Sequence, residues 1–256
     1  MCLILFAFRC HPRYSLVMAA NRDEFFERPT APARFWDTNP EILGGRDLKC
    51  GGTWLAMALD GRFAAVVNYR DPDTRKDDAP SRGDLATDFL LGNASSEDYL
   101  KILRKKAGRY NGFTLLFGDA EHLLCFSNRG SAPYSVQPGI HGISNHLLDT
   151  PWPKVVRGRK ALEGILSCGT DPPVEAMFSM LADRTMPDDN LLPETGIGPE
   201  WERLLAPIFI SGPVYGTRSS TVLMIGYDGM ATFIERTFDG SPDIFTTSEF
   251  SFRIES

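Results

Sequence analysis

The chain has 256 residues, of which 43% are hydrophobic, and it carries a formal net charge of -6 at pH 7. This size and composition suffice for a sizeable core, and since no linker-like segment interrupts the sequence, residues 1–256 are predicted to form a single domain. The acidic balance excludes a general nucleic-acid-binding surface, which would require clustered Lys and Arg.

The cysteines and the apolar runs indicate the cellular setting. Five cysteines, at positions 2, 10, 50, 125 and 168, are odd in number and include no Cys-x-x-Cys pair. This pattern argues against a disulfide framework and favours a reducing compartment. The opening apolar run is too short for a signal peptide, and no stretch reaches the ~18 apolar residues that a membrane span requires. We therefore expect a soluble, cytoplasmic protein without a membrane span.

The chain starts with two near-continuous apolar runs, residues 3–8 and 15–20. Uninterrupted runs are typical of strands that are covered on both faces. The second run ends in Asn21-Arg22-Asp23-Glu24, which we interpret as a strand-to-loop transition. If the two strands are antiparallel neighbours, the end of the second lies beside the start of the first, which would place Arg22 and Asp23 near Cys2.

Three pairs of apolar runs further along are separated by short Gly-containing turns, the pattern of β-hairpins. The pairs are residues 53–58 with 62–68, residues 113–117 with 122–126, and residues 221–227 with 230–235.

Helices are predicted between these hairpins. One spans residues 82–91, a second is capped by Ser95, a third begins at Thr150-Pro151 and a fourth spans residues 174–181. The Pro- and Gly-rich residues 186–199 are expected to form a surface loop. This order of elements predicts mainly antiparallel sheets packed by helices, an α+β layered architecture.

Cys2 is the first candidate for chemistry. It is either a small core residue, as free cysteines often are, or the first residue of the protein after removal of Met1. In the second case its α-amine, with a pKa of about 7.7–8.0, could take the proton of its own thiol. Arg22 could then favour the thiolate, and Asp23 could hold the new ammonium group. A surface ion-pair cluster is the alternative for these charged residues.

Three further polar residues lie at strand ends. Asn68 and Asn145 each close a predicted strand, and Arg218 opens another. An Asn amide at such an edge can donate to a developing oxyanion, although each of these residues could equally end a strand or form a turn.

Sites for phosphate, haem and metal are not indicated. The glycine pairs at residues 44–45 and 51–52 precede a strand and lack a following Gly-Lys-Ser/Thr. There is no Cys-x-x-Cys-His, and the four histidines have no ligand spacing. We therefore expect no metal and no cofactor.

Several motifs resemble those of the NRDE family, also called the transport and Golgi organisation 2 family. They are Met1-Cys2, Asn21-Arg22-Asp23-Glu24, Gly51-Gly52-Thr53-Trp54-Leu55, Asn68-Tyr69-Arg70, Gly142-Ile143-Ser144-Asn145 and Thr150-Pro151-Trp152-Pro153-Lys154.

The resemblance implies the N-terminal nucleophile hydrolase fold, a four-layer αββα sandwich of two mainly antiparallel sheets flanked by helices. Penicillin and bile-salt amidases are distant relatives that use an N-terminal cysteine. By that analogy the candidate catalytic residues are Cys2, Arg22, Asp23, Asn68, Asn145 and Arg218.

Three functions stay open at this point, because a fold does not fix a function. The first is hydrolysis of an amide or related acyl bond of a small molecule, with Cys2 as nucleophile. The alternative, which the family's links to haem trafficking and acyl-lipid or coenzyme A metabolism suggest, is a non-catalytic protein that carries haem or an acyl-lipid in the same pocket. The third is a structural or interaction role.

Overall fold

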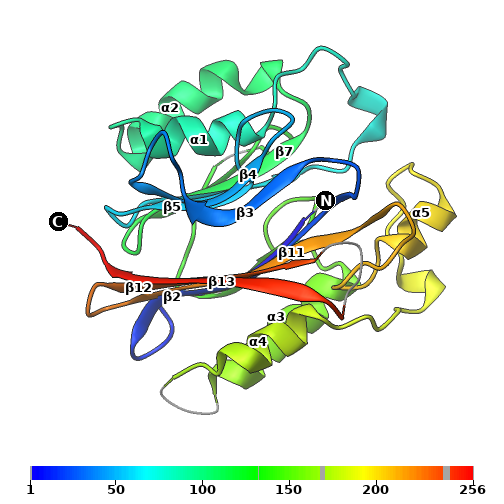
Figure 1. Cartoon of the computed structure of the whole chain (residues 1–256). Coiled ribbons are helices and arrows are strands. Elements are labelled where there is room, and N and C mark those ends of the chain that lie inside the picture. Colours follow the sequence, from blue (N-terminus) through cyan, green and yellow to red (C-terminus); the bar gives the residue numbers. More distant parts are fainter. Residues whose placement is uncertain (1, 132, 168–170, 239–242, 256) are drawn as a thin grey trace.

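Two antiparallel β-sheets lie face to face in the computed structural model, which describes residues 2–131, 133–167, 171–238 and 243–255 (Figure 1). The first sheet has the spatial order β10 (Gly139–Ile143), β1 (Cys2–Phe8), β2 (Tyr14–Phe25), β11 (Tyr215–Gly226), β12 (Met230–Phe238), β13 (Phe245–Arg253). The second has the order β3 (Thr30–Phe35), β4 (Ile42–Asp47), β5 (Leu55–Ala58), β6 (Phe63–Asn68), β7 (Phe113–Gly118), β8 (Leu123–Ser127), β9 (Tyr134–Ser135).

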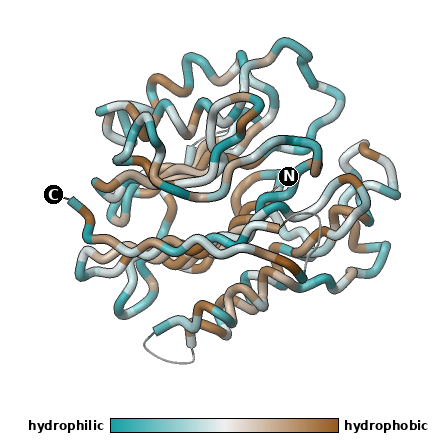
Figure 2. Tube along the Cα trace, in the orientation of Figure 1, coloured by the Kyte–Doolittle hydropathy of each residue, from teal (hydrophilic) through white to brown (hydrophobic). Residues whose placement is uncertain are grey.

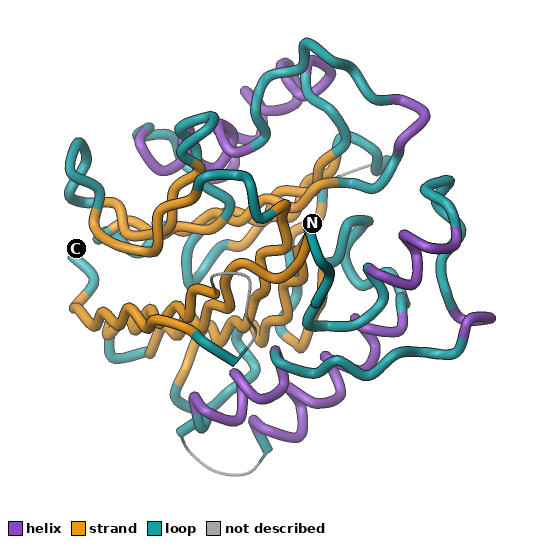
Figure 3. Tube along the Cα trace, turned by 45° about the vertical axis from the view of Figure 1, so that its right-hand side comes forward, coloured by secondary structure: helices purple, strands orange, loops and turns teal. Residues whose placement is uncertain are grey.

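Helices cover the outer face of each sheet, so the layers run helix, sheet, sheet, helix (Figures 1 and 3). On the second sheet lie α1 (Gly83–Leu91) and α2 (Ser96–Lys106), and on the first lie α3 (Pro153–Leu166) and α4 (Val174–Leu181). The short helix α5 (Pro199–Leu204) and three 3-10 turns, Pro72–Thr74, Ala107–Arg109 and Asp189–Leu191, complete the helical segments that the structure describes. The predicted four-layer α+β sandwich is confirmed. None of the described helices is long and apolar enough to cross a membrane.

Strand β1 shows how the near-continuous apolar runs are used. Ile4 and Phe6 point between the two sheets, where they join the core that both sheets share. Leu3 and Leu5 point the other way, into the core between the first sheet and helices α3 and α4. Both faces of the strand are therefore buried, as the sequence predicted. Apolar residues follow the strands through the middle of the molecule (Figure 2).

Most predicted elements are present, with differences at their ends. The three hairpins form β5–β6, β7–β8 and β11–β12, and α4 has the predicted bounds. The third helix begins at Pro153 with Trp152 as its N-cap, later than Thr150-Pro151. Residues 186–199 form a loop that contains one 3-10 turn, Asp189–Leu191.

One interpretation was wrong. The polar motif Asn21-Arg22-Asp23-Glu24 is no strand-to-loop transition but the continuation of β2, which ends at Phe25. The strand extends because β1 pairs with it on one side and β11 pairs with its full length on the other. Strands β3, β4, β9 and β13 were not predicted as strands, and β10 was predicted only near its end. Of the cysteines, Cys168 lies outside the described residues, and the other four are free thiols.

A close backbone approach fixes the loop between β4 and β5 against the start of α1. A Cβ at Gly52 would lie 2.7 Å from the carbonyl carbon of Gly83 and 3.1 Å from the backbone nitrogen of Asp84. Only a residue without a side chain fits there, which explains one glycine of the Gly51-Gly52-Thr53 motif.

We therefore expect Gly52→Ala to lower the free energy of unfolding by about 1–3 kcal/mol, because the helix must move away from the loop. Gly164→Ala is the matched control: it lies within α3, and an added Cβ would meet nothing within 4 Å. That change should raise the free energy of unfolding by about 1 kcal/mol. Urea denaturation of both variants checks the prediction, and equal stabilities of Gly52→Ala and the unmodified chain would contradict it.

Candidate active site

Cys2 and Arg22 are directly paired across the antiparallel strands β1 and β2. The predicted neighbourhood of the two strands is therefore confirmed. Opposite residues of an antiparallel pair project from the same face, so both side chains lie on the side that faces the second sheet. The Cys2 side chain is almost enclosed, with Cys2 only 7% exposed, and its thiol lies close to the backbone N–H of Asp23.

Strand alternation divides the Asn21-Arg22-Asp23-Glu24 motif into two pairs. Arg22 and Glu24 face the space between the sheets and line a cavity there. Asn21 faces the helical layer, where its Nδ2 donates to the carbonyl oxygens of Leu181 and Ile208, both at 2.9 Å. Asn21 thus fixes the sheet to the segments that cover it, while Arg22 is available to a ligand.

The cavity beside Cys2 has a volume of about 250 Å³ and lies where the first sheet meets the loop after β4 and the start of α1. Cys2, Arg22, Asp23 and Asn68 all line it. A second hollow of about 450 Å³ shares Glu24, Arg28, Asn68, Arg82 and Asn111 with the first. The structure therefore brings four of the six predicted residues to one cavity.

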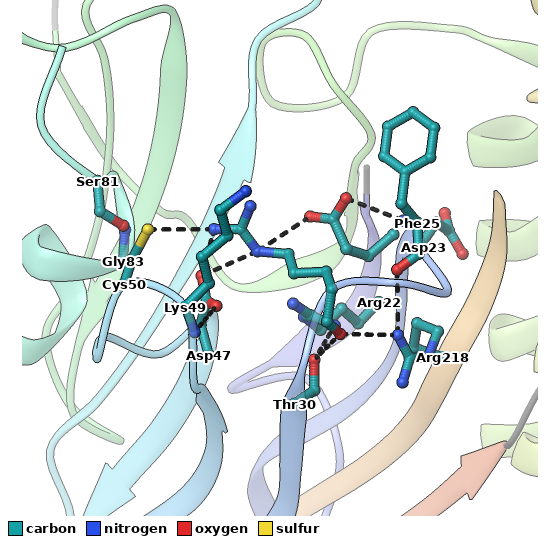
Figure 4. A network of polar contacts seen from close by, with 12 residues as sticks. Arg22, Asp23, Phe25, Thr30, Asp47, Lys49, Cys50, Ser81, Gly83 and Arg218 are labelled. Atoms are coloured by element: carbon teal, nitrogen blue, oxygen red, sulfur yellow. Dashed lines mark hydrogen bonds and ion pairs between the residues drawn. The ribbon is translucent and has the colours of Figure 1, made fainter. Parts of the chain in front are cut away.

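A charged network holds the mouth of this cavity together (Figure 4). The guanidinium of Arg28 lies 2.5 Å from Asp47 and 3.8 Å from Glu24, and it contacts the thiol of Cys50 at 3.3 Å. Although partial burial alone would raise the pKa of Asp47, the hydrogen bond from Arg28 holds this pKa below its usual value. The network links the turn after β2 to the loop after β4, one from each sheet.

Asp23 is buried beside a buried lysine of α3. Asp23 is 1% exposed and accepts a hydrogen bond from Thr217 Oγ1 at 2.7 Å, and Lys154 is 2% exposed and donates to the carbonyl oxygen of Leu205 at 2.8 Å. Burial raises the pKa of Asp23, and the charge of Lys154 opposes that rise. Burial also lowers the pKa of Lys154 to about 8, with Asp23 as the main opposing influence. The two side chains therefore form one electrostatic unit behind Cys2.

The two predicted asparagines have different surroundings. The Asn68 side chain lines both hollows, and its amide makes no hydrogen bond within the ranges that the structure describes. Asn145 is fully buried, has a φ of 50°, and donates from Nδ2 to the backbone oxygen of Asn68 at 2.9 Å. Asn145 thus positions the segment that carries Asn68, with its own amide already engaged.

Arg218 lines neither hollow. Its Nη1 donates to the backbone oxygens of Phe25, Phe26 and Arg28 at 3.0–3.1 Å, so it anchors the turn that follows β2. Figure 4 shows Arg218 beside Phe25. Since this turn carries Arg28, Arg218 lies one contact away from the charged network at the cavity mouth.

Sequence reasoning gave no role to Cys50, Arg82 or Lys154. A signal did exist for Lys154, because its spacing to Gly158 and Leu162 is helical and puts it on the buried face of α3. Cys50 and Arg82 line the cavity from a loop and from the N-cap of α1, and no local pattern marks either. Within the described residues, no group of three or more His, Cys, Asp and Glu could hold a metal ion.

Comparison with known proteins assigns the chain to a family. Residues 1–240 match the profile of the family described as Transport and Golgi organisation 2. The chain belongs to this family.

Relatives within the Transport and Golgi organisation 2 family are similar over their full length. The transport and Golgi organization protein 2 homologs of Bos taurus and Homo sapiens are 36% and 34% identical, with 100% of both chains covered in each case. Transport and Golgi organization protein 2 of Drosophila melanogaster is 30% identical over 94% of this chain and 93% of its own.

Two solved structures resemble the fold at lower similarity. An ortholog of N-acylethanolamine-hydrolyzing acid amidase from Caenorhabditis elegans has a TM-score of 0.49 and 12% identity, and covers 87% of this chain and 92% of that one. The C2A mutant of conjugated bile acid hydrolase from Clostridium perfringens has a TM-score of 0.46 and 10% identity, and covers 99% and 97%. The chemistry proposed below rests on this chain's own side chains.

The buried lysine makes stability depend on pH in a defined direction. Its folded-state pKa of about 8 lies below the ordinary value of 10.5, so between these values the unfolded chain binds the extra proton and the free energy of unfolding rises with pH. Lys154→Met lacks this titration. We expect the stability of the unmodified chain relative to this variant to increase by up to about 3 kcal/mol as pH rises through that window.

Urea denaturation of both proteins at several pH values between about 7.5 and about 10 measures this difference. Lys160→Met, a change on the exposed side of α3, is the matched control and should give a curve parallel to that of the unmodified chain. Parallel curves for Lys154→Met as well would show that Lys154 titrates as an ordinary surface lysine.

Proposed function

We propose that this protein is an N-terminal cysteine hydrolase that cleaves an amide or related acyl bond of a small molecule. Cys2 becomes the first residue after removal of Met1 and acts as the nucleophile. The observation that carries the proposal is the position of the Cys2 thiol, paired with Arg22 at the end of β1 and lining a cavity together with Asp23 and Asn68.

The Cys2 thiol needs a base to remove its proton before it can attack. Burial raises the pKa of Cys2, with Asp23 adding to the rise, while Arg22 and the backbone N–H of Asp23 oppose it. The resting thiol is therefore protonated at neutral pH. A free α-amine on the same residue, with a pKa of about 7.7–8.0, can accept the proton directly or through one water. Asp23 would hold the resulting ammonium, and Lys154 helps to keep Asp23 ionised despite burial.

The reaction then proceeds in two halves. The sulfur attacks the carbonyl carbon to form a C–S bond, the carbonyl becomes an oxyanion, and the ammonium returns its proton to the leaving amine as the C–N bond breaks. Water then attacks the thioester, which releases a carboxylic acid and the free thiol. Asn68 would donate to the oxyanion, because its amide has no other hydrogen bond among the described residues and Asn145 fixes its backbone.

A carrier of haem or of an acyl-lipid is the second candidate. It is favoured by the apolar side chains of Phe25 and Ile197, which line the second hollow next to Asn68. Phe25 is 42% exposed and lies 5.0 Å from the ring of Tyr215, so an aromatic surface is open to an apolar ligand. We place either function in the cytoplasm, where the free thiols of Cys10 and Cys50 would stay reduced.

Intact mass measurement with 4-nitrophenyl acetate tests the proposed nucleophile. We expect purified protein to begin at Cys2 and to gain one acetyl group on that residue, with a burst of 4-nitrophenol, because the thioester forms faster than water releases it. Cys2→Ala should show neither the burst nor turnover, and Cys50→Ala, the control for the second thiol of the cavity, should keep both.

Retained Met1 on active protein, or turnover by Cys2→Ala, would refute the hydrolase. Saturable binding of haem or of a fatty acid by Cys2→Ala, without acetylation of the unmodified chain, would instead support the carrier.

Asn68→Ala tests the oxyanion donor. Turnover of 4-nitrophenyl acetate should fall about 100- to 1,000-fold through kcat, because the lost hydrogen bond acts in the transition state. Stability should change little, since no hydrogen bond within the described residues is lost from the side chain. Asn93→Ala, at an exposed position after α1, is the control and should leave kcat unchanged. A loss confined to KM would show that Asn68 only binds substrate.

A further inference from the structure

Two arginines of the Cys2 cavity, Arg22 and Arg82, form no direct ion pair with an acidic side chain of the described residues. Arg22 is only 6% exposed, and the one side-chain hydrogen bond that the structure gives it runs from Nη1 to Thr30 Oγ1 at 3.1 Å. Arg82 donates from Nη1 to the backbone oxygen of Gly112 at 3.1 Å, and this is likewise its one side-chain bond to a described residue. A guanidinium has five N–H donors, so most donors of both groups are unused by the described part of the chain.

The acidic side chains of the cavity are engaged elsewhere. Asp47 and Glu24 pair with Arg28, and Asp23 accepts from Thr217 and faces the charge of Lys154. The positive charges of Arg22 and Arg82 are therefore not neutralised by ion pairs within the described residues. Because arginine keeps its proton and burial of an uncompensated charge is costly, this arrangement favours an anionic ligand.

The two guanidiniums reach one cavity from different elements. Arg22 lies on β2 directly across from Cys2, and Arg82 is the N-cap of α1, a helix fixed against the loop after β4 by the contact of Gly52 with Gly83. Both arginines line the cavity that contains the thiol. An anion between them would lie close to the nucleophile.

We propose that Arg22 and Arg82 form a subsite for an oxyanion, so that the substrate is an acyl compound with a carboxylate or phosphate group near its scissile bond. The guanidinium fork matches either group, with two parallel N–H···O bonds from each arginine. This inference rests on the proposed function for the identity of the scissile bond. Occupation of the subsite by an anion requires neither removal of Met1 nor turnover.

Two alkylating reagents of similar size, one anionic and one neutral, probe the subsite. Iodoacetate carries a carboxylate and iodoacetamide is neutral; in both, the thiolate sulfur displaces iodide. The rate ratio of the two reagents at Cys2, followed by peptide mass spectrometry, is compared with their ratio for 2-mercaptoethanol, a neutral thiol in solution. We expect the ratio at Cys2 to favour iodoacetate by about tenfold more, the effect of one charge-assisted hydrogen-bonded pair.

Variants of Arg82 test whether this side chain causes the preference of Cys2 for iodoacetate. Arg82→Gln should remove most of the preference, because one wall of the subsite loses its charge. Arg82→Lys, which keeps the charge without the fork, should retain part of it. Arg104→Gln is the matched control: it removes one positive charge from an exposed position in the last turn of α2 and should leave the ratio unchanged. An equal loss in Arg104→Gln and Arg82→Gln would attribute the preference to overall charge and overturn the subsite.

A second measurement does not depend on a reactive thiol. Inorganic phosphate and butyrate, each at constant ionic strength, are tested for a rise in the melting temperature of the unmodified chain, Arg82→Gln and Arg104→Gln. A rise with phosphate alone identifies a phosphate-bearing substrate, and a rise with butyrate alone identifies a carboxylate. In either case the rise should vanish in Arg82→Gln only.

No rise with either anion, together with no reagent preference at Cys2, overturns the proposal; if Cys2 resists both reagents, the melting temperatures decide alone. Failure of the hydrolase is a separate result, because it is measured by acetylation and turnover.

Discussion

The pairing of β1 with β2 is the interaction on which the site depends. It places Cys2 directly opposite Arg22, and all seven residues of β1 follow in register. Side chains alternate along a strand, so a slip of one residue would turn Cys2 toward the helices and Leu3 into the cavity. Such a slip would also move Ile4 and Phe6 out of the core between the sheets. Because the shifted register would lose this apolar burial, the observed register is the more stable one.

This register gives one short motif two tasks. Arg22 and Glu24 project into the space between the sheets, where both line the cavity and Glu24 pairs with Arg28. Asn21 and Asp23 project toward the helical layer, where Asn21 bridges to Leu181 and Asp23 lies beside Lys154. Burial of these polar groups would destabilise the fold if they were unpartnered, so the motif couples the position of α3 and α4 to the position of the thiol.

Much of the fold followed from local pattern. Apolar runs on both sides of Gly-containing turns gave the hairpins, and caps gave α2 and nearly gave α3. Strands β3 and β13 were missed because they lie at sheet edges and neither contains a continuous apolar run. The end of β2 escaped because its polar residues resemble a loop until β11, nearly two hundred residues later, pairs with them. That pairing is invisible to any local window.

The site was predictable to a similar extent. Cys2, Arg22 and Asp23 follow from one assumed strand pairing, whereas Asn68 and Asn145 could be suggested only as strand ends. Arg82 reaches the cavity through the approach of α1 to the loop after β4, which no spacing in the sequence reports. Arg218 was predicted at the start of a strand near the site, but its side chain donates hydrogen bonds to three carbonyl oxygens of the turn after β2.

The start of β1 also has a practical consequence for anyone who produces this protein. Cys2 is already the first residue of an inner strand, between β10 and β2, and it lines the cavity. An affinity tag fused ahead of it would therefore begin at the cavity. A purification handle is therefore better placed after β13, which does not line the cavity.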